Sequence, residues 1–478
     1  MELTRIAEHV WELPRQGGMH VPGRIYASEK LMRELESEPA LGQVANVAHL
    51  PGIVGYALAM PDIHWGYGFP IGGVAAVDAD EGVISPGGIG FDVNCGVRLL
   101  RTGLDADALA PHLSRVADAL FQAIPAGVGS EGAIPKLTQA EEKKILARGA
   151  AWAVAREFGR PSDLESTEEG GCLGGADPDA VSATALERGR TQVGTLGSGN
   201  HFLEIERVDE IYDARTASAL GLHVGQVTLM IHSGSRGLGY QVCDDALRTI
   251  GKAMARYGIT VPDRQLACVP LDSPEGRDYL GAMAAAANFA WTNRQVMAGL
   301  AERAFETALG LGPADLRFSL VYDVCHNIAK MEEHVVDGRR RRVCVHRKGA
   351  TRAFGPGHPA LAPHLRPLGQ PVIIPGDMGR YSFLLVGTAR AMDETFGTTC
   401  HGAGRMMSRS QAKKVGRGVD LVAELAKRGV IVRARSLGGV AEEMPWAYKD
   451  VVDVVDVVDR AGIGRKVARL KPLAVIKG

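Results

Sequence analysis

The sequence lacks features that mark several protein classes. No apolar run approaches the roughly 20 residues that a helix needs to cross a bilayer. Met1–Gly18 lacks the basic, apolar and small-residue order of a signal peptide. The seven cysteines are scattered and odd in number, which argues against a disulfide framework. We therefore expect a cytoplasmic protein without a membrane segment, whose special cysteines, if any, serve a metal or chemistry.

Several nucleotide- and metal-binding signatures are also missing. There is no Gly-x-x-x-x-Gly-Lys-Ser/Thr, which excludes a P-loop NTPase. There is no Lys-x-Asp-Gly, so the ligase route through a lysine–nucleotide intermediate is not available. The absence of Cys-x-x-Cys excludes a zinc finger. Because the formal net charge is only −1, any nucleic-acid contact requires a local basic patch.

Glycine, in contrast, is abundant. Many of the 60 glycines stand in short clusters beside polar residues, which indicates tight turns and close approaches of backbone to ligand. A length of 478 residues by itself suggests two or three domains. However, no Pro/Ser-rich linker divides the chain and no solenoid repeat occurs. We therefore expect one domain over residues 1–478.

Short β-branched runs alternate with helical patterns along the chain. Strands are predicted at Val97–Leu100, Phe202–Ile205, Val227–Ile231, Phe318–Val321, Val343–Val345 and Val372–Ile374. Helices are predicted at Asp105–Ile124, Gln139–Phe158, Glu275–Leu309 and, as a surface helix with a stripe of aspartates, Val451–Asp459. Ser166–Gly194 is predicted to be a long loop. This mixture predicts an α+β (mixed α/β) fold with mixed β-sheets and flanking helices.

Five short segments concentrate residue types that bind divalent metals. They contain Asp92 with Cys95, His201, His232, His326 and His401. A lone histidine is more often structural, but each of these adjoins Asn, Ser or Gly near a predicted strand end, where side chains from different strands converge. Thiolate and imidazole suit zinc, iron or cobalt, and a carboxylate also admits manganese. The spacing leaves open whether there is one metal or two.

Two glycine clusters and one basic segment are candidates for phosphate binding. Gly194–Gly199 and Gly234–Gly239 both read Gly-x-x-Gly-x-Gly, which fits a phosphate cradle or a plain turn equally well. Seven positive charges lie within Arg339–Arg352, after Asp337-Gly338, a hairpin-turn signal. Arg339–Arg342 also fits a solvated turn. Arg347, Lys348 and Arg352 stand beside Gly and Thr and are better suited to phosphate.

Six motifs in one order resemble the RtcB family of RNA-splicing ligases. They are Pro61-Asp-Ile-His-Trp-Gly-Tyr-Gly68, Phe91-Asp-Val-Asn-Cys-Gly-Val-Arg98, Leu196-Gly-Ser-Gly-Asn-His-Phe-Leu-Glu204, Ile231-His-Ser-Gly-Ser-Arg236, His346-Arg-Lys-Gly-Ala-Thr-Arg352 and Cys400-His-Gly-Ala-Gly-Arg405. The resemblance extends from about residue 20 to Gly478. It implies an RtcB-type fold with a central active-site cleft.

The resemblance implies a reaction that joins RNA ends with GTP. A 2′,3′-cyclic phosphate is opened to a 3′-phosphate, a histidine is guanylylated, and GMP passes to the 3′-phosphate to give RNA(3′)pp(5′)G. The 5′-hydroxyl of the second RNA end then attacks and releases GMP. A covalent histidine intermediate splits one difficult transfer into two easier ones. Two manganese ions would clamp the triphosphate, and archease is a candidate activating partner.

The resemblance also implies roles for individual residues. His401 would be the guanylylated nucleophile, and Asp62 and His64 would assist proton transfer. Asp92, Cys95 and His201 would hold one manganese ion; Cys95, His232 and His326 would hold the other. The implied nucleotide contacts are Asn200, His201, Phe202, Leu203, Glu204, His326, Asn327, Pro375, Gly376, Asp377, Met378, Ser382, His401, Gly402, Ala403, Gly404, Tyr448 and Lys477. Phe202 and Tyr448 would sandwich the guanine. Arg236, Arg405 and Arg409 match positions near phosphate or RNA, and Arg347, Lys348 and Arg352 are expected to contact RNA.

One position departs from the family pattern. The family reads Pro-Gly-Ser-Met-Gly where this chain has Pro375-Gly-Asp-Met-Gly379. A carboxylate facing a triphosphate would repel it unless the carboxylate is turned away or paired with a cation. Asp377 therefore puts its own nucleotide contact, and the preference for GTP, in question.

Two other classes of function remain open at this point. The metal-ligand set alone would also serve a metal-dependent phosphoesterase or cyclic phosphodiesterase. The basic segment alone would serve a non-catalytic RNA-binding module. Neither a phosphoesterase nor an RNA-binding module needs His401, Lys477 or the aromatic pair Phe202 and Tyr448. Their presence favours the ligase.

Overall fold

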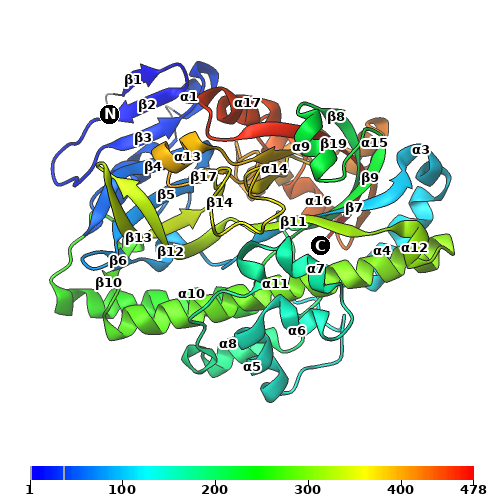
Figure 1. Ribbon diagram of the computed structural model, residues 1–478, viewed down its shortest axis with the longest axis horizontal. Coiled ribbons are helices and arrows are strands. Elements are labelled where there is room, and N and C mark those ends of the chain that lie inside the picture. Colours follow the sequence, from blue (N-terminus) through cyan, green and yellow to red (C-terminus); the bar gives the residue numbers. More distant parts are fainter. Residues whose placement is uncertain (1–2, 36–37) are drawn as a thin grey trace.

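The computed structural model describes residues 3–35 and 38–478, and two large β-sheets form its centre (Figure 1). The seven-stranded sheet has the order β1 (Thr4–Ala7), β2 (Val10–Leu13), β3 (Gly23–Tyr26), β4 (Ile53–His64), β5 (Ile71–Asp78), β13 (Arg339–Lys348) and β12 (Asn327–Val336). The eight-stranded sheet includes β11 (Ser319–Cys325), β7 (Gly96–Asp105), β9 (Gln226–Ser233), β8 (Phe202–Ile211), β19 (Arg465–Lys477), β16 (Ser382–Val386) and β15 (Pro371–Ile374), with β18 (Ile431–Ala434) on β19. Short pairs join β6 (Val83–Ile84) to β10 (Val269–Pro270) and β14 (Ala350–Arg352) to β17 (Thr398–Cys400).

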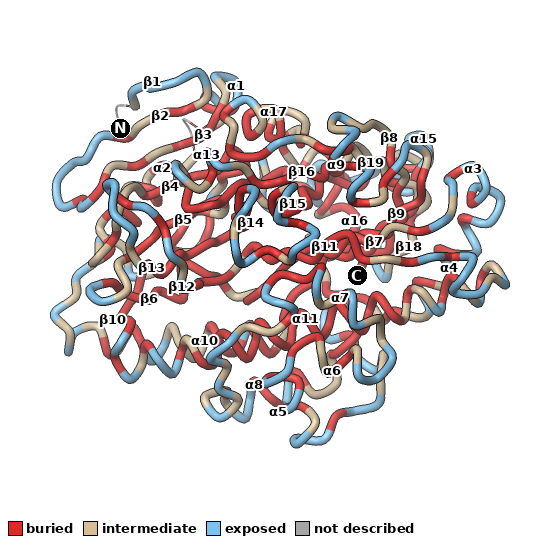
Figure 2. Tube along the Cα trace, viewed as in Figure 1, coloured by how far each residue is buried: buried red, intermediate tan, exposed pale blue. Residues whose placement is uncertain are grey.

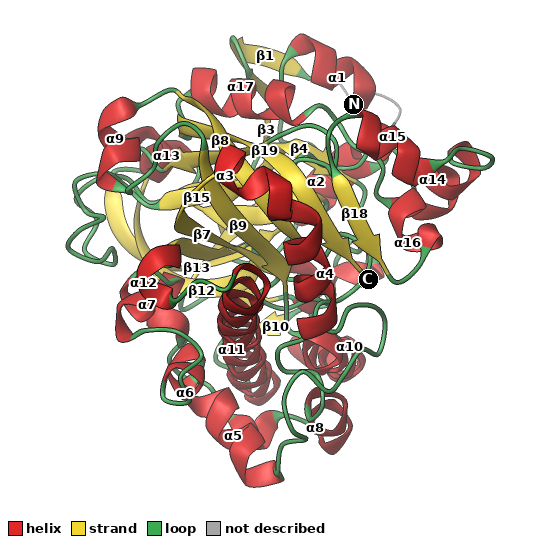
Figure 3. Ribbon diagram, turned by 90° about the vertical axis from the view of Figure 1, so that its right-hand side faces the viewer, coloured by secondary structure: helices red, strands yellow, loops and turns green. Residues whose placement is uncertain are grey.

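Helices surround both sheets (Figure 3). They are α1 (Glu29–Leu35), α2 (Ala40–Val47), α3 (Ala106–Leu109), α4 (Leu113–Ala123), α5 (Gln139–Arg148), α6 (Ala150–Val154), α7 (Pro161–Glu165), α8 (Ala183–Gly189), α9 (Ala214–Ala219), α10 (Arg236–Ala253), α11 (Pro274–Leu309), α12 (Pro313–Leu316), α13 (Ala389–Glu394), α14 (Arg409–Val415), α15 (Leu421–Lys427), α16 (Leu437–Glu442) and α17 (Val451–Ala461). Parallel pairs (β3 with β4, β18 with β19) occur beside antiparallel ones. The predicted α+β fold with mixed sheets is therefore confirmed.

The long helix α11 runs beneath the sheets (Figure 1). Ser273 caps it by accepting a hydrogen bond from the Gly276 amide, and Gly310 ends it in the left-handed region at φ 68°. With α4 it covers one face of the eight-stranded sheet, where Leu229 and Ile231 of β9 point. Met230, between them, packs in the cluster on the other face. Among the described residues, no helix combines the length and apolarity that a membrane span requires.

Most elements lie where the sequence predicts them. All six predicted strands and the helices at Glu275–Leu309 and Val451–Asp459 are present, and α17 buries valines while its aspartates face outward. The prediction of one helix over Gln139–Phe158 is wrong, because Gly149 at φ +54° separates α5 from α6. The loop predicted over Ser166–Gly194 also contains α8 and two short 3₁₀ helices.

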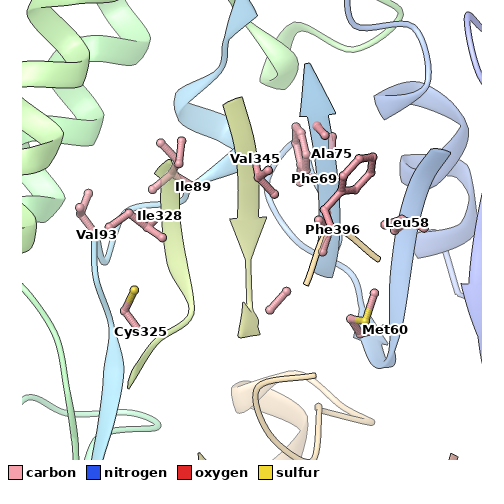
Figure 4. Close-up of a cluster of buried hydrophobic side chains, with 14 of the residues drawn as sticks. Leu58, Met60, Phe69, Ala75, Ile89, Val93, Cys325, Ile328, Val345 and Phe396 are labelled. Carbon is pink, nitrogen blue, oxygen red and sulfur yellow. The ribbon is translucent and has the colours of Figure 1, made fainter. Parts of the chain in front are cut away.

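The interior is continuous from one sheet to the other (Figure 2). Figure 4 shows part of it, where Leu58 on β4, Ala75 on β5 and Val345 on β13 meet Phe69 and Phe396. Such packing makes the strand ends rigid supports for the loops that follow them.

Antiparallel pairing brings several motif residues to one edge of the eight-stranded sheet. Phe202 at the start of β8 pairs with His232 near the end of β9 and with Lys477 at the end of β19. Gly96 at the start of β7 pairs with Ser233 on β9 and with Cys325 at the end of β11. Cys95, His201 and His326 directly adjoin these paired ends. The edge therefore gathers residues that are far apart in the sequence.

Candidate metal centre and adjoining pocket

Five side chains converge at this edge and form two overlapping groups of metal-ligand type. One group is Cys95, His232 and His326, and the other is Asp92, Cys95 and His201. The ligand atoms within each group all lie within 4.8 Å of one another. The two groups coincide with the two ligand sets that the resemblance implies.

Cys95 stands between the two groups. Its Sγ lies 3.4 Å from His201 Nε2 and 3.3 Å from His232 Nε2. His232 Nε2 is 3.3 Å from His326 Nε2, and His201 Nε2 is 2.7 Å from an Asp92 carboxylate oxygen. A sulfur at this position is within reach of two cations.

The donor chemistry fits bound cations. Burial and the Asp92 carboxylate raise the pKa of Cys95, so a thiolate here requires a neighbouring positive charge. Burial and the surrounding imidazoles lower the pKa of His232 and His326, which keeps both rings neutral and able to donate a lone pair. One set offers a carboxylate, a thiolate and an imidazole, and the other offers the same thiolate and two imidazoles. Two such sets that share a sulfur suit a pair of divalent ions.

His401 lies beside this cluster, at the end of β17. Its ring centroid is 4.8 Å from that of His326. The buried Asp62 carboxylate is 2.6 Å from His401 Nδ1 and accepts hydrogen bonds from the backbone amides of His401 and Gly402. Although burial opposes it, the His401 ring lowers the pKa of Asp62, which keeps the carboxylate charged. Nδ1 thus carries a proton toward Asp62, and Nε2 presents the lone pair.

Lys449 holds the strand end that carries Asp62. Its ammonium donates to the carbonyl oxygens of Ile63 (2.6 Å) and Pro61 (3.4 Å), and its backbone amide donates to Gly404. Burial lowers the pKa of His64 to about 3, so this ring, which lines the pocket, is neutral. Lys449 was not expected from the sequence, because a lone lysine carries no local signal.

A pocket with a cavity volume of about 130 Å³ lies next to His401. The expected nucleotide residues that line it are Asn200, Phe202, Glu204, Pro375, Gly376, Asp377, Met378, His401, Gly402, Ala403, Gly404, Tyr448 and Lys477. His201, Leu203, His326, Asn327 and Ser382 do not line it. Leu203 packs in the helix-facing core because neighbouring residues of a strand point to opposite faces.

Charged and aromatic side chains both line the pocket, among them Glu204, Lys477, Phe202 and Tyr448. Burial, and then the neighbouring Glu206, raise the pKa of Glu204. Lys477, buried at the end of β19, donates to the carbonyl oxygens of Gly199 and His201. The Tyr448 hydroxyl donates to Glu443, which also lines the pocket and was not expected from the sequence.

The Asp377 carboxylate forms an ion pair with Arg380. Arg380 also donates to the backbone carbonyls of Pro445 (3.0 Å), Tyr448 (3.2 Å) and Lys449 (3.1 Å). It therefore ties the Pro375–Gly379 loop to the segment that carries Tyr448. Because the carboxylate is paired with a cation, it repels a triphosphate less than a free carboxylate at this position would.

The inner part of the basic segment, with Arg347, Lys348 and Arg352, is buried. Arg347 is fully buried and donates to Glu332 at 2.6 and 2.9 Å, and Arg352 pairs with Glu168 and Glu169. Lys348 is buried and donates to the carbonyls of Tyr67 and Gly87. These cations have hydrogen-bond or ion-pair partners in the interior, and their contact with RNA phosphates stays a prediction.

The hairpin turn itself lies as predicted. Asp337 and Gly338 join β12 to β13 with φ values of 50° and 74°. The side chain of Arg340 is 79% exposed, so the tip is a solvated turn.

The three other expected RNA-contacting arginines differ in exposure. Arg236, at the start of α10, donates to Thr195, Gly127 and Ser130. Arg405 pairs with Glu443 and lies over the Tyr448 ring. Arg409 is half exposed at the pocket mouth. Arg409 is the freest of the three to meet a ligand.

The fold and the site together define an α+β protein with a candidate divalent-metal centre next to a pocket. The chain belongs to the RtcB family, because the family model described as tRNA-splicing ligase RtcB matches residues 43–478. A "tRNA-splicing ligase RtcB" of Archaeoglobus fulgidus is 54% identical over 478 residues, covering 100% of this chain and 99% of the relative. One of Thermococcus kodakarensis is 53% identical with the same coverage. An "RNA-splicing ligase RtcB" of Mycobacterium tuberculosis is 53% identical over 91% of this chain and 100% of its own length.

Proposed function

We propose that the protein is a GTP- and manganese-dependent RNA ligase of the cytoplasm. It would join RNA ends that carry a 2′,3′-cyclic phosphate or 3′-phosphate to 5′-hydroxyl ends, as in RNA repair or tRNA splicing. The observation that carries the proposal is His401, whose Nδ1 is held by Asp62 while its ring stands between the metal-ligand cluster and the pocket. Family membership and the names of the relatives support the same assignment.

The pocket would bind GTP. Phe202 and Tyr448 offer ring faces to the guanine, and Glu204 offers oxygens to the guanine N–H groups. An ionised Glu204 would accept two such bonds, and the bound base would offset the burial that raises its pKa. Lys477 brings positive charge close to the same wall.

His401 would act as the nucleophile. Its Nε2 lone pair attacks the α-phosphorus of GTP, the bond to the β-phosphate oxygen breaks, and pyrophosphate leaves. Asp62 keeps the proton on Nδ1 and stabilises the positive charge that develops on the ring. An oxygen of the RNA 3′-phosphate then attacks this phosphorus and displaces His401. Finally the 5′-hydroxyl attacks the activated RNA phosphate, and GMP leaves.

Two manganese ions would be held by the cluster. Asp92, Cys95 and His201 would bind one, and Cys95, His232 and His326 the other. Bound there, they would neutralise charge on phosphate oxygens. The mixed carboxylate, thiolate and imidazole donors admit manganese but do not exclude zinc or iron.

Covalent labelling tests the proposal. The protein is incubated with manganese and GTP labelled at the α-phosphate, and then denatured. We expect acid-labile GMP on the wild type and none on His401→Ala. His223→Ala, which changes an exposed histidine far from the pocket, should label normally. A wild type that hydrolyses cyclic phosphate but acquires no label would be a phosphoesterase, and a wild type that only binds RNA would be a binding module.

A further inference from the structure

Three aromatic side chains from distant segments gather outside the pocket. Tyr67 and Phe91 meet edge to face with ring centroids 5.5 Å apart, and Phe91 stacks on Tyr240 of α10 at 4.9 Å and 23°. Tyr240 is 48% exposed, and Trp65, two residues before Tyr67, is 58% exposed. We call Tyr67, Phe91 and Tyr240 the aromatic platform.

Exposure of large aromatic side chains is rare in this protein. Within residues 3–35 and 38–478, only Trp65, Tyr240 and Tyr212 are exposed aromatics. Two of these three stand at or beside the aromatic platform. Tyr212 follows β8, at the end of the strand opposite to Phe202. The concentration of uncovered rings at one place indicates a surface that binds something flat and apolar.

Residues of the aromatic platform adjoin residues of the site in the sequence. Phe91 precedes Asp92, Trp65 follows His64, and Tyr240 lies one helical turn after Arg236. The Asp92 side chain is 30% exposed, whereas Cys95, His232 and His326 are buried. The cluster is therefore open to solvent at the residue that adjoins the aromatic platform.

Acidic groups and one buried ammonium lie near the Tyr67 ring of the aromatic platform. Burial raises the pKa of Tyr67, with Cys243 and the carboxylates of Asp263 and Asp244 adding to the shift, so acidic groups lie nearby. The Lys348 ammonium is 5.9 Å from the Tyr67 ring, but it is buried and donates to backbone carbonyls. A ligand would therefore present its bases to this surface and keep its phosphates away from it.

We propose that the aromatic platform stacks bases of the single-stranded RNA whose end reaches the pocket past Asp92. Every base has a π face, so such stacking is tolerant of sequence and suits an enzyme that acts on RNA ends. The inference rests on the RNA ligase function proposed above, and it assigns a part of the path that the RNA follows.

RNA binding by single-ring variants tests the inference. The probe is a fluorescent 12-nucleotide single-stranded RNA with a 3′-phosphate, and its Kd is measured by anisotropy with manganese present. Tyr240→Ala should weaken binding roughly tenfold, which is the size expected for one stacked base. Tyr212→Ala, the matched change of an exposed tyrosine elsewhere, should bind as the wild type does. Phe91→Leu keeps an apolar side chain without a ring and should also weaken binding.

Two further measurements separate stacking from other effects. Because no phosphate contact is removed, the slope of log Kd against log salt should not change in Tyr240→Ala. A probe with abasic nucleotides next to the 3′ end should bind the wild type and Tyr240→Ala equally. Wild-type affinity of Tyr240→Ala for the intact probe, or an unchanged defect with the abasic probe, overturns the inference.

Self-guanylylation distinguishes this inference from the proposed function. The reaction needs no RNA, so Tyr240→Ala should acquire GMP at the wild-type rate. If the wild type acquires no GMP, the ligase proposal fails, while the RNA affinities still report on the aromatic platform. If labelling is normal and Tyr240→Ala binds RNA normally, the aromatic platform alone is wrong.

Discussion

At the scale of single residues, Asp62 decides which nitrogen of His401 can react. The carboxylate lies 2.6 Å from Nδ1 and also accepts hydrogen bonds from the backbone amides of His401 and Gly402. These contacts hold the His401 ring in one orientation. The His401 ring holds the pKa of Asp62 below its usual value against the effect of burial. Asp62 is thus ionised throughout the range in which an enzyme works, and a pH dependence of labelling near neutrality cannot come from it.

Replacing Asp62 tests this control of the ring. Asp62→Asn is nearly isosteric, but its amide can donate to Nδ1 and so favours the wrong tautomer. We expect labelling of His401 under single-turnover conditions to slow by about 100-fold or more. Manganese content, measured by plasma mass spectrometry, should match the wild type. Normal labelling of this variant would show that the orientation by Asp62 is dispensable.

Cys95 belongs to both metal-ligand groups, and its Sγ is the ligand atom that the two groups share. A serine hydroxyl ionises far less readily than a thiol, even beside a cation. We therefore expect Cys95→Ser to lose bound metal and, with it, both guanylylation and RNA joining. Cys172→Ser, at a half-exposed cysteine outside the site, is the control. Unchanged metal stoichiometry in Cys95→Ser would make Cys95 only a small core residue.

Arg380 compensates for Asp377 at the pocket wall. Without the guanidinium, Asp377 would be an unpaired carboxylate where the nucleotide binds, and the Tyr448 segment would lose three hydrogen bonds. We expect Arg380→Ala to raise KM for GTP in self-guanylylation by roughly tenfold, with kcat at saturating GTP little changed.

The partner residue supplies the control for Arg380. Asp377→Asn in the Arg380→Ala background should recover part of the loss, because the repulsive charge is gone. Arg390→Ala, which breaks an exposed pair with Glu394, should leave KM unchanged. Equal KM values for Arg380→Ala and the wild type would show that the ion pair does not serve the pocket.

At the scale of elements, the β12–β13 hairpin shows how one strand carries two kinds of arginine. The outer half, Arg339–Arg342, is largely exposed, whereas the inner half lies between β5 and β12 and buries Arg347. Arg347 lowers the pKa of Glu332, although burial acts in the opposite direction. Because the folded-state pKa is depressed, the pair stabilises the protein at neutral pH, and this stabilisation is lost as pH falls through the acid range.

The two halves of the hairpin should respond differently to neutralisation. Arg347→Ala leaves Glu332 buried without its main partner, which should lower the free energy of unfolding by about 3–5 kcal/mol. Arg340→Ala at the exposed tip should leave the unfolding free energy nearly unchanged. Chemical denaturation with urea measures both. An Arg347→Ala variant with wild-type stability and weaker RNA binding would show that Arg347 contacts RNA.

At the scale of the whole molecule, the site exists only because both sheets contribute to it. Cys95, His201, His232 and His326 lie at one edge of the eight-stranded sheet, β4 of the seven-stranded sheet carries Asp62, and His401 follows β17 of the short β14–β17 pair. Since the ligand residues lie between 92 and 326 in the chain, the unfolded state has no such cluster. Metal binding should therefore stabilise the folded state selectively.

Thermal unfolding tests this coupling. Metal-stripped protein should melt at a lower temperature than the untreated protein, and added manganese should raise Tm in a concentration-dependent way. Cys95→Ser should show little response to manganese. A Tm that is insensitive to manganese in the wild type would argue against a built metal centre.

The local pattern of the sequence determined much of this protein. Motifs of only six to nine residues predicted the ligand residue types, the strands that carry or adjoin them, and membership of the RtcB family. These features depend on neighbours a few residues apart, which is why they can be read without a structure. The turn at Asp337-Gly338 is of the same kind.

Only the tertiary structure decided which charges are free and which rings are exposed. The local sequence around Arg347 and Lys348 predicts a phosphate site. Their hydrogen-bond partners, Glu332 and Gly87, come from other segments of the chain. Asp377 and Arg380 are near in sequence, but the carbonyls that fix Arg380 come from residues 445–449. Tyr67, Phe91 and Tyr240 meet from three separate segments. Burial and pairing are properties of long-range contacts, so no local pattern encodes them.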